Sequence, residues 1–270
     1  MGDQSKDLVV VEVRDGVADV RLNRPEKLNA LGPGTMRALV DVGQRLAAAP
    51  PEEVGAVVLS GEGRAFSAGL DFAEFEKMSE QDSSDLLAHD GPPVGVAEAL
   101  GQQAVHVWSL VGAPVIAAVH GVAFGGGLQV ALGADLRLAA PDARFSVTEV
   151  LWGLVPDMMG TQVLPGLVGR DVALELALTG RTFGAEEADR IGLVTRLADD
   201  PREAALALAA EVAGHSRGAT RGIKRLVGLA SGPLEEGLHA EQDVIGALMG
   251  GEEQLAAVAR RMESLGRSAR

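Results

Sequence analysis

The 270-residue chain contains neither cysteine nor tyrosine, and aromatic residues make up only 3% of it. Without cysteine the chain cannot form a disulfide framework, a catalytic thiol or a thiolate-bound metal site. The histidines show no spacing with acidic residues that suggests a metal site, so we expect no bound metal; they are His89, His106, His120, His215 and His239.

Long hydrophobic runs and positive charge are also scarce. No stretch approaches the roughly 18 consecutive apolar residues of a membrane span. The first residues, MGDQSKDLVV, lack the basic region and apolar stretch of a secretion signal, so we expect a cytoplasmic protein without a membrane partner. The formal net charge of −14 argues against a nucleic acid partner, because phosphate binding needs an electropositive surface.

The chain is rich in aliphatic residues. Hydrophobic residues make up 47% of the sequence, and many of them are alanine, valine and leucine. A chain of this length and composition can bury a sizeable core, either as one large domain or as a domain with an appendage.

The order of the expected elements indicates an α/β fold with an α-rich C-terminal part that begins near residue 200. Residues 9–14 and 17–22 read as two strands, and Asp15-Gly16 between them is a strong hairpin signal. The polar residues 79–94 are expected to form a mobile surface segment. The other expected elements are a helix over 33–49, a strand over 55–60, a helix over 95–111, strands over 136–139 and 144–147, and mainly helices after residue 159.

Two glycine-rich turns, each between a buried strand and a helix, are the most informative local feature. The first includes AFSAGLD at residues 65–71, and the second follows the apolar run at 115–119 and contains Gly125, Gly126 and Gly127. Adjacent glycines suit a place where the backbone turns sharply or closely approaches a ligand. Two such turns can each present one backbone N–H to the same oxygen atom, which would stabilise a negative charge there.

A dinucleotide-binding fingerprint is an alternative interpretation of the second turn. Its glycines do not fall on the GxGxxG spacing, and no acidic residue lies at the distance beyond them that the motif requires. We therefore exclude a dinucleotide site.

Four segments in register resemble the signature blocks of the crotonase superfamily, the enoyl-CoA hydratases and isomerases. They are LNRPEKLNAL (22–31), AFSAGLD (65–71), HGVAFGGGLQVALGAD (120–135) and RFSVTEVLWGLVPDMMGTQ (144–162). The likeness covers residues 8–230. It implies the crotonase fold, with a spiral of β-β-α units over residues 1–199 and a helical trimerisation region over 200–270. It also implies an acyl-CoA substrate, no separate cofactor, and a homotrimer or dimer of trimers.

The resemblance assigns an oxyanion hole to two backbone N–H groups, that of Leu70 in the first turn and that of Gly126 in the second. Removing a proton next to a thioester carbonyl, or adding water to a conjugated double bond, produces an enolate whose oxygen carries new negative charge. A preorganised donor that meets this oxygen stabilises the transition state by on the order of 3 kcal/mol.

The acid-base residues distinguish between reactions within the family. Hydratases of the family hold a water with two glutamates, but the first of these positions is Gln129 here and the second is retained as Glu149. A carboxamide can orient a water but cannot usefully accept its proton.

Asp157 lies eight residues after Glu149, where most hydratases have a small residue. This Glu/Asp pair is similar to that of the dienoyl-CoA isomerases, although those enzymes carry an aspartate where Gln129 stands. Two carboxylates in a partly apolar pocket push their pKa values apart, which suits one base and one acid. Asp157 either serves as the second proton carrier or caps the helix that follows it.

The resemblance places CoA recognition around the N-terminal block, around the first turn and on one C-terminal helix. The implied binding residues are Lys27, Leu28, Ala30, Ser67, Ala68, Asp71 and Lys224. Asp71 also fits a helix cap that stabilises the turn around Leu70. Trp152, Met158 and Met159 either shape the acyl pocket or pack in the core.

We therefore expect an acyl-CoA-processing enzyme that stabilises a thioester enolate and shifts a carbon–carbon double bond, with Glu149 as the principal proton carrier. One alternative is hydration of a 2-enoyl-CoA by Glu149 alone, with Gln129 holding the water. The others are an acyl-CoA hydrolase or decarboxylase and a non-catalytic acyl-CoA-binding protein.

Overall fold

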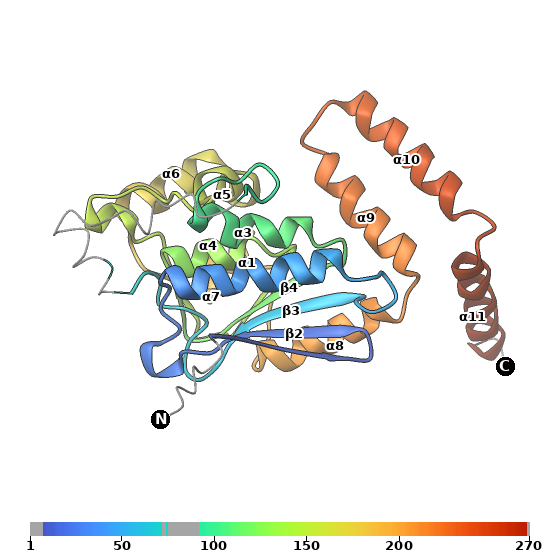
Figure 1. The fold of residues 1–270 in the computed structure, drawn as a ribbon, viewed down its shortest axis with the longest axis horizontal. Coiled ribbons are helices and arrows are strands. Elements are labelled where there is room, and N and C mark those ends of the chain that lie inside the picture. Colours follow the sequence, from blue (N-terminus) through green and yellow to red (C-terminus); the bar gives the residue numbers. More distant parts are fainter. Residues whose placement is uncertain (1–7, 72–73, 75–91, 269–270) are drawn as a thin grey trace.

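Six strands form the main sheet of the computed structural model, which describes residues 8–71, 74 and 92–268 (Figure 1). β1 and β2 pair antiparallel, and all other neighbours in this sheet pair parallel. The parallel strands therefore end at the same edge, where the loops that follow them come together. The order across the sheet is β1 (Val9–Arg14), β2 (Val17–Leu22), β3 (Ala56–Gly61), β4 (Val115–Val119), β6 (Leu136–Ala139) and β9 (Arg196–Leu197).

A smaller sheet continues from the main one. It contains β5 (Val122–Phe124), β7 (Arg144–Ser146) and β8 (Phe183–Gly184) in that order. β4 leads into β5 through Gly121, whose φ of 61° is left-handed, and β6 is followed by β7. The chain thus steps twice from the first sheet to the second, which is the β-β-α spiral that the family resemblance implied.

Alternate side chains of β3 point to opposite faces of the sheet and pack in two different hydrophobic clusters. Val57 and Leu59 belong to the main cluster, to which α1 (Pro33–Ala48) and α3 (Leu100–Leu110) contribute, whereas Ala56 and Val58 pack with α8 (Pro201–Ala213). Figure 1 shows α1 and α8 on opposite sides of the strands. Because both faces of the sheet are covered, the strand reads as a continuous apolar run rather than as an alternation.

The position of α8 corrects the expected boundary at residue 200. Ala205 and Ala209 of this helix are fully buried in the cluster that contains Val58 and Ile116. Small side chains on the buried face let the helix backbone lie close to the sheet. The core therefore extends through α8, and the expected core over residues 1–199 is too short by one helix.

Three helices follow the core and extend away from it in Figure 1: α9 (Arg217–Leu229), α10 (Leu234–Leu248) and α11 (Glu252–Ser268). Hydrophobic side chains are exposed on all three, including Ile223, Val227, Leu234, Leu238, Leu255 and Val258. Apolar faces of this extent are typical of a surface that meets another protein.

Shorter helices and two 3₁₀ turns connect the strands. They are η1 (Pro25–Lys27), α4 (Gly126–Leu132), η2 (Glu149–Trp152), α5 (Gly160–Val168), α6 (Arg170–Thr179) and α7 (Ala185–Arg190). Within the described ranges, no helix is long and apolar enough to cross a membrane.

The observed elements differ from the expected ones at the start of one helix and at two short strands. The helix expected from residue 95 begins at Leu100, because Val94 and Ala97 pair with each other in a short bridge. The two-residue strands β8 and β9 lie inside a region expected to be helical. Most of the expected mobile segment, residues 79–91, lies outside the described residues.

Replacing Ala209 with Asp should lower the free energy of unfolding by about 3 to 5 kcal/mol, because it buries an unpaired carboxylate between α8 and the sheet. Ala207→Asp is the matched control, since Ala207 is exposed on the same helix; its cost should stay below about 1 kcal/mol. Urea denaturation measures both values. Equal losses in the two variants would show that α8 does not pack on the sheet.

Candidate active site

The first expected donor, the N–H of Leu70, is aimed by a main-chain bridge. Leu31 pairs with Leu70 in parallel fashion: Leu31 N donates to Gly69 O at 2.7 Å, and Asp71 N donates to Leu31 O at 2.8 Å. Both bonds use the neighbours of Leu70, so its own N–H points to the opposite side of the bridge. Gly69 has a φ of 91°, which favours glycine at this turn.

The second expected donor is Gly126, the first residue of α4. An N–H at this position has no acceptor within its own helix. The preceding Gly125 has a φ of 49° and a ψ of −122°, a conformation that favours glycine. A Cβ built on Gly69 would lie 2.6 Å from Phe124 O and 3.6 Å from Gly126 N. The two glycine-rich turns are therefore in direct contact, and Phe124 N donates to Ser67 O at 3.1 Å.

An ion pair joins the N-terminal block to the first turn. Arg24 Nη2 lies 2.9 Å from Asp71 Oδ2, and Arg24 Nη1 donates to Ala30 O at 3.1 Å. Both side chains are largely buried. Arg24 thus braces the turn on the C-terminal side of Leu70. Arg24 was not among the expected site residues, because its partner lies 47 residues away in the sequence. Its place inside the LNRPEKLNAL block was the available signal.

Several of the expected CoA-binding residues turn out to shape the two turns. Ser67 is fully buried; its hydroxyl donates to Asn29 O at 2.8 Å and accepts from Gly69 N at 3.3 Å. Its side chain is therefore engaged within the protein. Asn29, with a φ of 55°, donates from its side chain to Glu62 O and Ala65 O.

The other residues of this group lie around the same turn. Ala68 N donates to Leu28 O at 2.9 Å, so the N-terminal block and the first turn are adjacent here. Ala30 is buried, and Lys27 is exposed at the end of η1. Four residues thus remain candidates for contact with the CoA portion of a substrate: Lys27, Leu28, Ala30 and Ala68.

Lys224 lies elsewhere in the fold. Its Nζ is 2.7 Å from Asp135 Oδ2 and donates to Trp108 O and Ala113 O, both at 3.2 Å. These partners lie around the start of β4 and β6, whereas Gly126 follows the other end of β4. In the described chain, Lys224 holds α9 against the core and is not brought to the two donors.

The acid-base pair is in direct contact. Gln129 Nε2 donates to Glu149 Oε1 at 2.6 Å, and Gln129 Oε1 accepts from Gly160 N at 2.8 Å. Gln129 is 2% exposed and Glu149 is 9% exposed. A Cβ on Gly125 would lie 3.3 Å from Glu149 Oε1, which places the carboxylate beside the second turn. The carboxamide therefore fixes one oxygen of Glu149 and anchors itself to the start of α5.

The second oxygen of Glu149 is buried and has no hydrogen-bond partner among the described residues. Burial raises the pKa of Glu149 above its ordinary value; hydrogen bonds from the backbone and from Gln129 oppose this rise, and the charge of Asp157 adds to it. A buried polar atom without a partner is costly and is characteristic of a functional site.

The remaining site candidates lie at several places in the fold, and Asp157 is near enough to Glu149 to affect its pKa. Asp157 is exposed on the single chain, yet nearby protein atoms partly desolvate it and raise its pKa. Met158 is buried, and its sulfur lies 3.0 Å from the place where a Cβ of Gly126 would stand. Trp152 is about half exposed at the end of η2. His120 Nε2 lies 3.0 Å from Gly63 O, in keeping with a structural histidine.

No metal-binding arrangement is present in the described part of the chain. Among residues 8–71, 74 and 92–268, no group of three or more His, Asp or Glu side chains could hold a metal ion.

Comparison with known proteins agrees with this geometry. The family model described as Enoyl-CoA hydratase/isomerase matches residues 12–260. The chain is 37% identical over 239 residues to the probable enoyl-CoA hydratase echA8 of Mycobacterium leprae (strain TN), covering 87% of each chain. It is 34% identical over 244 residues to the hydroxycinnamoyl-CoA hydratase-lyase of Pseudomonas fluorescens, covering 87% of this chain and 84% of that protein.

A solved structure shows the same likeness in three dimensions. The crystal structure of the enoyl-CoA hydratase from Bacillus anthracis matches with a TM-score of 0.84 at 27% identity and covers 95% of this chain and 96% of the other. The expected crotonase fold is thereby confirmed. Because the family model spans nearly the whole chain and the expected donor turns and Glu149 come together in the fold, this protein belongs to the enoyl-CoA hydratase/isomerase family.

Proposed function

We propose that this enzyme shifts a carbon–carbon double bond along the acyl group of an enoyl- or dienoyl-CoA. The hydrogen bond from Gln129 to Glu149 is the observation that carries the proposal. It leaves one carboxylate in the pair, with one oxygen held and the other oxygen without a partner among the described residues. A single carboxylate can move one proton between two carbons.

The reaction proceeds in two proton transfers. The thioester oxygen accepts hydrogen bonds from the N–H groups of Leu70 and Gly126. The free oxygen of Glu149 removes a proton from the carbon next to the double bond, and the electrons move into a dienolate whose charge rests on the thioester oxygen. Glu149 then returns the proton to the far carbon of the conjugated system, so the product has the same composition as the substrate.

Hydration needs more from the pair than this site supplies. One group must take a proton from water while the other delivers a proton to carbon. The side-chain oxygen of Gln129 accepts a hydrogen bond from Gly160 N, and its side-chain nitrogen donates one to Glu149. A carboxamide cannot act as the base that takes a proton from water. Asp157, on the segment that follows η2, serves as the second proton carrier for dienoyl substrates.

Hydration of a 2-enoyl-CoA with Glu149 as the single acid and base is the second candidate. It is favoured by the names of the similar proteins, several of which are called hydratases. In that reaction the water would have to bind the unpartnered oxygen of Glu149.

Assembly and binding complete the proposal. The exposed apolar faces of α9, α10 and α11 pack against other copies of this chain in a homotrimer or a dimer of trimers. The proposed reaction requires no cofactor, because coenzyme A is part of the substrate.

Introducing a carboxylate at position 129 tests whether the enzyme is an isomerase rather than a hydratase. A panel of 2-enoyl-, 3-enoyl- and dienoyl-CoA, followed by mass and ultraviolet absorbance, should give products of unchanged mass with the native enzyme. Gln129→Glu should then raise formation of the product that is heavier by one water about tenfold or more, because a second group can activate water. Gln162→Glu is the matched control, since Gln162 is exposed on α5, and should change neither product.

Rapid water addition by the native enzyme, comparable with its isomerisation rate, would instead establish the hydratase. Glu149→Gln should lower either activity by on the order of 10²- to 10⁴-fold while CoA binding persists. A native chain that turns over none of the panel would be an acyl-CoA-binding protein.

The pH profile should report the buried base. Glu149 must be ionised to accept a proton, so kcat/KM should fall as the pH drops through its pKa, and this limb should lie above 4.5, the ordinary value for glutamate. Asp157→Asn removes a negative charge that raises this pKa, so the limb should move to lower pH. An upward shift in that variant, or a limb at or below the ordinary value, would contradict the assignment of Glu149 as the base.

A further inference from the structure

The segment that carries the second donor is closed at its two ends by one aspartate. It runs from the start of β4 to the residue before β6, and Gly126 lies near its middle. Asp135 Oδ2 accepts from Val115 N at 2.7 Å, and Asp135 N donates to Val115 O at 2.9 Å. These hydrogen bonds between Asp135 and Val115 form a clasp, which fixes where the chain leaving α4 lies relative to the start of β4.

Lys224 of α9 binds this clasp from outside the segment. Its Nζ lies 2.7 Å from the same oxygen, Asp135 Oδ2, and donates to Trp108 O and Ala113 O, both at 3.2 Å. Trp108 lies in the last turn of α3, where the helix dipole favours a cation. The lysine side chain is 13% exposed, so solvent ions screen these contacts little. One ammonium group thus joins the end of α3, the turn before β4 and the clasp.

The helix between the clasp and the donor has little room to absorb a change at its carboxyl end. All 7 residues of α4 are buried. A Cβ on Gly133, the next residue, would lie 2.6 Å from Val105 O and 3.3 Å from Trp108 Cδ1, so this end packs directly on α3. A helix of this length measures about 10 Å, and a tilt of about 10° about its carboxyl end would move the Gly126 N–H by more than about 1 Å. Such a displacement is enough to misplace an oxyanion donor.

We infer that Lys224 and Asp135 are positioning residues, which through the clasp hold α4 in the orientation that directs the Gly126 N–H at the thioester oxygen. The inference rests on the proposed function in taking Gly126 as a donor to an acyl-CoA thioester. It makes the strength of this donor depend on the docking of α9, because that helix carries the lysine. Both residues act through α4, so their loss should affect the polarisation of the thioester more than the affinity for the ligand.

A neighbouring cation of α9 provides a comparison. Arg221 lies one turn before Lys224, and its Nη2 donates to Val54 O at 3.4 Å. Its guanidinium also packs over Gly112, where a Cβ would leave it no room. Val54 and Gly112 precede β3 and β4 and are not part of the clasp. Arg221 thus docks the same helix on the core at a different place.

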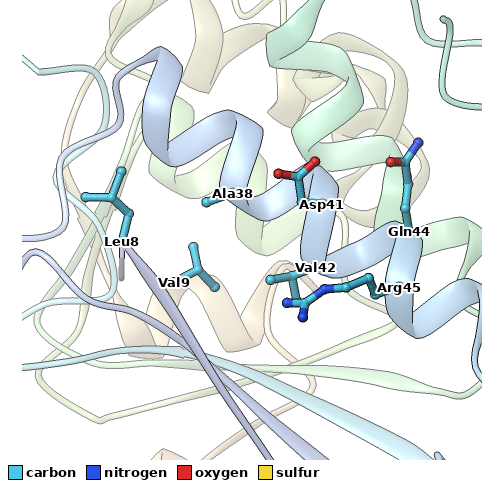
Figure 2. Close-up of a pocket in the computed structure, with 7 residues that line it drawn as sticks. All are labelled: Leu8, Val9, Ala38, Asp41, Val42, Gln44 and Arg45. Carbon is cyan, nitrogen blue, oxygen red and sulfur yellow. The ribbon is translucent and has the colours of Figure 1, made fainter. Parts of the chain in front are cut away.

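A cation remote from the clasp lies on α1. Figure 2 shows a groove between β1 and α1 in which Asp41, Gln44 and Arg45 stand along one helix. Arg45 is exposed, and the residues that line this groove belong neither to the clasp nor to the two glycine-rich turns. Its replacement therefore measures the effect of losing one surface charge.

Visible absorbance of a bound aryl thioester tests the inference. In 4-(dimethylamino)cinnamoyl-CoA the thioester is conjugated with the ring, so hydrogen bonds to the thioester oxygen shift its absorption to longer wavelength. The probe has no saturated carbon next to its double bond, so isomerisation cannot consume it. Titration of the full chain with the probe gives both the dissociation constant and the size of the shift.

Lys224→Met should reduce the shift by about half or more and lower kcat for the best substrate of the panel about tenfold, while the dissociation constant stays within about threefold. Asp135→Asn removes the ion pair but keeps an oxygen for Val115 N. It should act in the same direction, and it serves as the second variant if the first folds poorly. Arg221→Met and Arg45→Met are the matched controls and should retain the native shift, with kcat within about twofold.

Two results would overturn the inference and leave the proposed function standing. One is a native shift and kcat in the folded Lys224→Met and Asp135→Asn variants. The other is an equal loss in Arg221→Met, which would make the docking of α9 in general, and not the clasp, responsible. A native enzyme that binds the probe without any shift would contradict the assignment of Leu70 and Gly126 as donors, and would overturn the proposed function and the inference together.

Discussion

Main-chain hydrogen bonding between three distant segments is the constraint on which the site depends. Leu31 pairs with Leu70, and Ser67 pairs with Ala123, so the N-terminal block and both glycine-rich turns lie side by side. An N–H that is flanked by ladder bonds has its direction set by the backbone, whatever side chain it carries. Donors positioned in this way need no reorganisation when charge develops on a substrate, which is the condition for strong transition-state stabilisation.

Polar side chains around this frame brace the turns, with one exception. Ser67, Asn29 and Arg24 satisfy buried carbonyls or carboxylates and thereby hold the turns together. Glu149 is the exception, because one of its oxygens is buried without a partner among the described residues. Burial raises its pKa, and the carboxamide of Gln129 holds its other oxygen, which is the arrangement expected of the proposed base.

Local patterns predicted the elements well and their packing less well. The hairpin at Asp15-Gly16 has the expected strands, because turn chemistry and alternation act over a few residues. The two-residue strands β8 and β9 exist only through pairing with distant partners, so no local signal marks them. The assignment of α8 to the core was missed because an alanine-rich helix shows little contrast between its buried and exposed faces.

By itself, the sequence determined the fold family and the segments that carry the chemistry, since glycine-rich turns, their flanking strands and the residues at 129 and 149 are local features in a fixed order. Tertiary structure decided what those residues do. In the folded chain Gln129 is hydrogen-bonded to both Glu149 and Gly160, and Ser67 is buried and hydrogen-bonded to Asn29. Lys224 forms an ion pair with Asp135, and Arg24 forms an ion pair with Asp71. The partners of each of these contacts are 20 residues or more apart in the sequence, and only the packing of the whole chain sets their distances and the dielectric around them.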